Sequence, residues 1–109
     1  MDELIAFLVA RYDETEAEAR DWQPHERYPE DPNEMDTRWN LIPSYTPARV
    51  LRDIEAKRKR LASYSAARAA VDRYDDQYMA GVASGLADAI KDDSAVWSDH
   101  PDYREDWVA

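Results

Sequence analysis

The sequence predicts an all-α fold, and three observations support this prediction. Apolar residues recur at three- and four-residue intervals over most of the chain, which is the period of an amphipathic helix. The helix breakers are concentrated in one place, because five of the six prolines lie within residues 23–47 and only two glycines are present. The one candidate strand, residues 37–42, lacks an obvious partner. At 109 residues, we expect a single domain with one modest core.

The first predicted helix covers residues 2–21. Leu4, Leu8 and Tyr12 recur at helical spacing, and acidic residues occupy the first turn, where the helix dipole favours them. A proline-rich connection over residues 23–45 follows, because each proline biases its preceding residue towards extended conformations. Connections of this length are uncommon in compact domains, so we expect apolar side chains to hold it against the helices. These side chains are Tyr28, Trp39, Leu41 and Ile42.

Two further helices are predicted over residues 46–62 and 66–91. Thr46 is a suitable N-cap, and Pro47 follows at the first helical position, where a missing N–H costs nothing. The sequence "SYS" at 63–65 favours a turn and an antiparallel pair, although one 45-residue helix stays open as an alternative. The apolar stripe of the last helix is expected to contain Val71, Tyr78, Met79, Val82, Leu86 and Ile90. Gly81 and Gly85, spaced as G-x-x-x-G, favour close packing of two soluble helices.

The C-terminal sequence "DHPDYREDW" predicts a short helix over residues 99–107. Asp99 is a suitable N-cap, and Tyr103 and Trp107 would lie four residues apart on one face. Two aromatic side chains on one face must be buried, so we expect them to pack on the first helix or near Trp97. The candidate docking residues are Trp97, His100, Tyr103 and Trp107.

The charge distribution limits the classes of partner. The net charge is −10, which disfavours direct binding to nucleic acid or to an anionic membrane. Residues 1–39 carry −8, residues 40–60 carry +4 and residues 61–109 carry −6. We interpret the basic stretch 55–60 as a solvated helix face that meets acids of the fold or of a partner subunit; a basic ligand patch is the alternative. The N-terminus has acids where a signal peptide needs positive charge, so we expect a cytoplasmic protein.

Few residues are available for catalysis, and we expect neither enzymatic activity nor a cofactor. The chain has no cysteine, which excludes disulfides and thiolate chemistry, and its two glycines cannot form a phosphate-binding loop. The low-probability alternative is a metal-dependent activity at one of the two histidines. His25 lies near Glu26 and Glu30, and His100 lies near Asp99 and Asp102. Neither histidine shows a helical ligand spacing, so we expect no metal site.

Two functions of different classes fit the composition. The favoured hypothesis is a non-enzymatic interaction protein that forms a homo-dimer or higher homo-oligomer, because the apolar stripes of the two later helices are longer than the first helix can cover. The alternative is an acidic protein that mimics nucleic acid and inhibits a DNA-binding protein or nuclease of a host. Its candidate surface on the first helix consists of Asp13, Glu14, Glu16, Glu18 and Asp21.

Three motifs carry a resemblance to a known family. "DELIAFLVARYDETEAEAR" at 2–20, "TPARVLRDIEAKRKRL" at 46–61 and the closing "DHPDYREDW" resemble small uncharacterised actinobacterial and actinophage proteins that share a domain of unknown function. The chain departs from their pattern before "PARVL", where it has Ser44, Tyr45 and Thr46, and it lacks a cysteine that some relatives carry. The resemblance implies a bacterial or phage protein and brings no activity with it.

Overall fold

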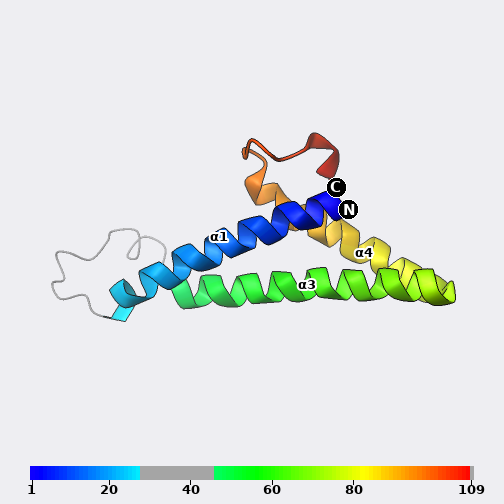
Figure 1. Ribbon diagram of the computed structural model, residues 1–109, viewed down its shortest axis with the longest axis horizontal. Coiled ribbons are helices and arrows are strands. Elements are labelled where there is room, and N and C mark those ends of the chain that lie inside the picture. The colour runs from blue at the N-terminus through cyan, green and yellow to red at the C-terminus, as the bar shows by residue number, and fades with distance from the viewer. Residues whose placement is uncertain (28–45, 109) are drawn as a thin grey trace. The chain divides into compact units, whose positions relative to one another are not determined.

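The computed structural model describes residues 1–27 and 46–108, and in this part of the chain every regular element is helical (Figure 1). The elements are α1 (Asp2–Arg27), α3 (Pro47–Tyr74), α4 (Gln77–Ser94) and two short 3-10 helices, η1 (Ala95–Trp97) and η2 (Glu105–Trp107). The fold is therefore all-α, as the sequence predicts. The expected strand at 37–42 and the four side chains expected to hold the connection lie outside the described residues.

The first helix is longer than predicted. We expected it to end near residue 21, but α1 continues to Arg27 and includes Pro24. A proline removes one backbone hydrogen bond and favours a kink, and a helix can continue beyond it when the remaining bonds form. The preceding turns are supported by ion pairs from Arg11 to Glu14 (2.9 Å) and from Arg20 to Glu16 (2.8 Å), at the spacings that suit a helix.

The chain divides into two compact units, and α1 and α3 contribute to both. The first unit contains Met1–Ala10 and Lys57–Ala109, and the second contains Arg11–Ala56. In the second unit, Tyr12 and Ala19 of α1 and Pro47 and Ile54 of α3 are buried. In the first unit, α1, α3, α4 and the C-terminal segment all supply buried apolar side chains. These are Leu4, Phe7, Leu8, Leu61, Ala67, Ala83, Ile90 and Trp107.

The start of α3 agrees with the sequence prediction. The Thr46 Oγ1 atom accepts a hydrogen bond from the backbone N–H of Arg49 at 3.2 Å, and Pro47 is the first helical residue. This side-chain acceptor satisfies one of the N–H groups that a helix leaves unpaired at its first turn.

The turn between α3 and α4 lies further along the chain than predicted. Neither a break at 63–65 nor one continuous helix is correct, because α3 continues to Tyr74 and α4 begins at Gln77. Serine and tyrosine cost a helix little, whereas the two aspartates provide the geometry of a turn. Asp75 has a φ of 51°, which aspartate tolerates better than most residues. Asp76 caps α4, and its side chain accepts from the N–H of Met79 at 3.2 Å.

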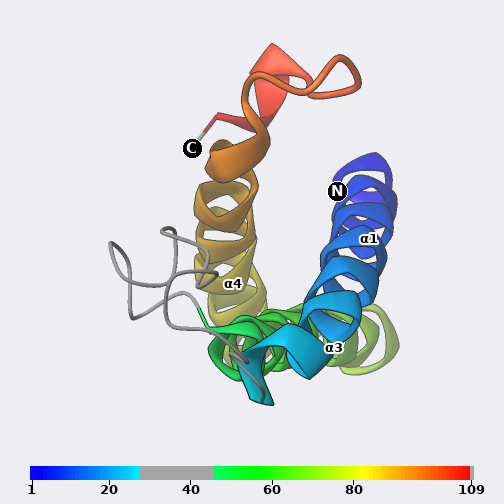
Figure 2. The ribbon, with the colours of Figure 1, turned by 90° about the vertical axis from the view of Figure 1, so that its left-hand side faces the viewer.

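The C-terminal segment docks as expected but does not form the predicted helix over 99–107. It consists of successive turns and η2, with i→i+3 hydrogen bonds such as Tyr103 N–H to the His100 carbonyl at 3.0 Å. Pro101 disfavours the helical region for His100, and the Nδ1 atom of His100 accepts from the N–H of Asp102 at 3.0 Å. This side-chain contact stabilises a turn in place of a first helical turn. Figure 2 shows the segment leaving the end of α4 and turning back.

Candidate interaction surfaces

The C-terminal residues form an aromatic cluster with Phe7 of α1. The Phe7 ring lies 5.3 Å from the His100 ring, 6.2 Å from the Tyr103 ring and 5.1 Å from the Trp107 ring, between ring centroids. Tyr103 and Trp107 also meet edge to face at 5.5 Å. Such geometries are favoured between aromatic rings, and Trp107 is only 8% exposed. The expected packing of Tyr103 and Trp107 on the first helix is therefore observed.

A polar contact lies beside the aromatic cluster. The guanidinium group of Arg104 pairs with Glu3 at the start of α1 and with Asp106 in η2, the latter at 3.2 Å. Of the four candidate docking residues, Trp107 is buried, and His100, Tyr103 and Trp97 are half-buried. Three of them are thus occupied in the fold of the first unit, which limits the ring surface that they offer to a partner.

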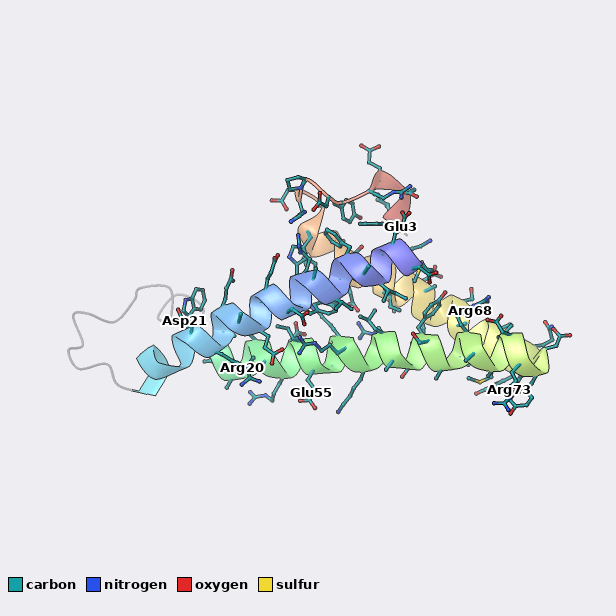
Figure 3. The ribbon with its side chains drawn as sticks, viewed as in Figure 1. Glu3, Arg20, Asp21, Glu55, Arg68 and Arg73 are labelled. Carbon is teal, nitrogen blue, oxygen red and sulfur yellow. The ribbon has the colours of Figure 1, made fainter. Side chains whose placement is uncertain are left out.

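The acidic surface predicted on α1 is present and is interrupted by arginines. Asp13, Glu14, Glu18 and Asp21 are exposed and Glu16 is half-buried. Glu14 is paired with Arg11, and Glu16 is paired with Arg20. In Figure 3, Arg20 and Asp21, which are neighbours in the sequence, lie on different sides of α1, so both signs of charge occur around this helix. The surface is less uniformly negative than a row of phosphates.

The basic stretch at the centre of α3 meets an acid of the same unit. Arg60 forms an ion pair with Asp93 of α4, and the exposed fractions of these side chains are 36% and 15%. This contact agrees, for Arg60, with the interpretation of the stretch as a helix face that meets acids of the fold. It joins the centre of α3 to the end of α4.

The structure also shows an exposed surface where the sequence predicts buried residues. Tyr78 was expected in the apolar stripe of its helix, but it is 79% exposed, and Tyr74 on the other side of the turn is 69% exposed. Gly81 and Gly85 were expected to pack against a second helix. A Cβ atom at either glycine would have no neighbour within 4 Å, so no described part of this chain packs there. We call Tyr74, Tyr78, Gly81 and Gly85 the tyrosine surface.

The reason for the incorrect assignment is the register of α4. Ala83 and Ile90, seven residues apart, are buried, and the helix turns Tyr78 away from them. A hydrophobic stripe drawn through every large apolar residue is too wide, because tyrosine has a polar end and tolerates exposure. Ala83 on α4 and Ala67 on α3 are both buried, and these small apolar residues were the signal that could have identified the correct face.

The described residues show no grouping suited to a metal ion. Within residues 1–22 and 46–108, whose side chains the structure describes, no three histidine, aspartate or glutamate residues lie together in a way that could hold one. Nδ1 of His100 is occupied by the N–H of Asp102. The side chains of His25, Glu26 and Glu30 lie outside the described part of the structure. None of the described helices combines the length and the apolar character needed to cross a bilayer.

Comparisons with known proteins agree with the resemblance carried by the three sequence motifs. No curated protein and no solved structure matches the chain. A family model does match, over residues 1–109, and it describes a family of unknown function. The chain therefore belongs to this family, DUF6221.

Proposed function

We propose that this protein is a non-enzymatic interaction module that associates with itself through the tyrosine surface. The observation that carries the proposal is the exposure of two aromatic side chains at one turn, Tyr74 at 69% and Tyr78 at 79%. Tyrosine is among the residues that contribute most to binding energy at protein interfaces. Phe7, Tyr103 and Trp107 of the same unit, by contrast, pack their rings against one another.

The surroundings of the two tyrosines fit a protein partner. Arg73 lies over the Tyr74 ring, with its guanidinium carbon 5.5 Å from the ring centroid, so the ring is held by a cation–π contact on the surface. The adjacent glycines present helix backbone without side chains, which allows another helix to approach closely. The proposal keeps the cytoplasmic location that the acidic N-terminal residues led us to expect.

The test of this proposal is the mass of the protein in solution. We expect light scattering after gel filtration at tens of micromolar to give about twice the 12.7 kDa mass of one chain. The double variant Tyr74→Ala/Tyr78→Ala should shift this mass towards the monomer. Val96→Ala, which removes another exposed apolar side chain (68% exposed), is the matched control and should leave the mass unchanged. A monodisperse monomer for the natural sequence would contradict the proposal.

A second candidate function is supported by the exposed acids of α1. Asp13, Glu14, Glu18 and Asp21 could take the place of phosphates in the binding site of a nuclease or DNA-binding protein. Binding of this kind weakens steeply with added salt. A pull-down from an actinobacterial lysate tests it: recovery of a DNA-binding protein, lost at high salt and lost with Glu18→Lys/Asp21→Lys, would support mimicry. Recovery of the bait alone would favour self-association.

A further inference from the structure

We draw no further inference here: the strongest candidate, the surface patch at the turn between α3 and α4 where the exposed Tyr74 and Tyr78 flank Asp75 and Asp76 in the sequence, belongs to the tyrosine surface already described, and nothing in the described residues shows what covers it.

Discussion

Two groups of aromatic side chains in the first unit differ in what their rings contact. At the C-terminal segment, Tyr103 and Trp107 pack on Phe7 and are largely withdrawn from water. At the turn between α3 and α4, Tyr74 and Tyr78 are exposed over most of their surface. The same chemistry therefore serves two purposes: the first pair closes the core of the unit, and the second is available to another molecule.

The cause of this difference lies in the neighbours of each ring. The C-terminal segment turns back onto α1, where Leu4, Phe7 and Leu8 form an apolar surface. Tyr74 is the last residue of α3, where the Arg73 guanidinium group contacts its ring, and Tyr78 lies in the first turn of α4. Substitutions in the aromatic cluster should therefore affect stability, and substitutions on the tyrosine surface should affect association.

Deletion of residues 99–109 should have the largest effect. It removes three rings from Phe7 and the Arg104 contact to Glu3, so apolar surface of α1 becomes exposed to water. We expect the melting temperature, measured by circular dichroism, to fall by at least several degrees. A truncated chain that melts with the full chain but loses a binding partner would show that the segment is a recognition peptide.

Trp107→Ala isolates the main contribution to that effect. The side chain is 8% exposed and contacts two rings, and replacing a buried tryptophan by alanine costs about 3 to 5 kcal/mol in unfolding free energy. Urea denaturation gives this quantity. The neighbouring Val108 is 66% exposed, so Val108→Ala is the control and should change the free energy by less than about 0.5 kcal/mol. Equal effects of the two substitutions would show that the aromatic cluster does not hold the segment.

Asp76→Ala, at the turn between α3 and α4, should have a smaller effect on the unfolding free energy. It removes the side-chain acceptor of the Met79 N–H, and loss of an N-cap costs about 1 kcal/mol. Asp76→Asn keeps an acceptor at this position and should retain most of the stability. If the two variants are equally destabilised in urea, the cap contributes nothing and the position of the turn has another cause.

These elements also show which parts of the structure could be predicted from the sequence. The Thr46–Pro47 start of α3 was predictable, because a cap and a first-turn proline act locally. The position of the next turn was not predictable from the apolar periodicity. The turn forms because Asp75 adopts a left-handed conformation and Asp76 caps α4, whereas the interruption at 63–65 does not end α3. The docking of Trp107 followed from its hydrophobicity, whereas its turn-rich backbone depends on Pro101 and on the side chain of His100.

The candidate site was predictable only in part, because the register of its helix depends on which residues the tertiary structure buries. Gly81 and Gly85 were recognisable from their spacing, but whether they face a helix of this chain or open space depends on the register of α4. That register is set by tertiary contacts of Ala83 and Ile90, which the periodicity alone does not distinguish from Tyr78. The acids of α1 were recognisable as charges, and their pairing with Arg11 and Arg20 follows from helical spacing.

Gly81→Ala should stabilise the folded monomer slightly. The position is exposed and helical and has space for a methyl group, so the gain is about 0.5 to 1 kcal/mol in unfolding free energy. The measurement is urea denaturation of Gly81→Ala beside the natural chain at the same low concentration. A destabilised Gly81→Ala chain would mean that the space beside Gly81 is covered by another part of the chain.

Arg104→Ala should have the smallest effect, although Arg104 joins residues far apart in the chain. Its side chain and that of Glu3 are 52% and 72% exposed, and exposed ion pairs contribute between zero and about 1 kcal/mol because water already solvates both charges. We expect the unfolding free energy to change by less than about 0.5 kcal/mol and the difference to disappear in 1 M salt. Arg60→Ala is the informative comparison, because the Asp93 carboxylate that it pairs with is only 15% exposed and is solvated far less. Arg60→Ala should therefore destabilise the protein more than Arg104→Ala does. The opposite order in urea denaturation would show that the exposed pair with Glu3 contributes more to stability than the less exposed pair with Asp93 does.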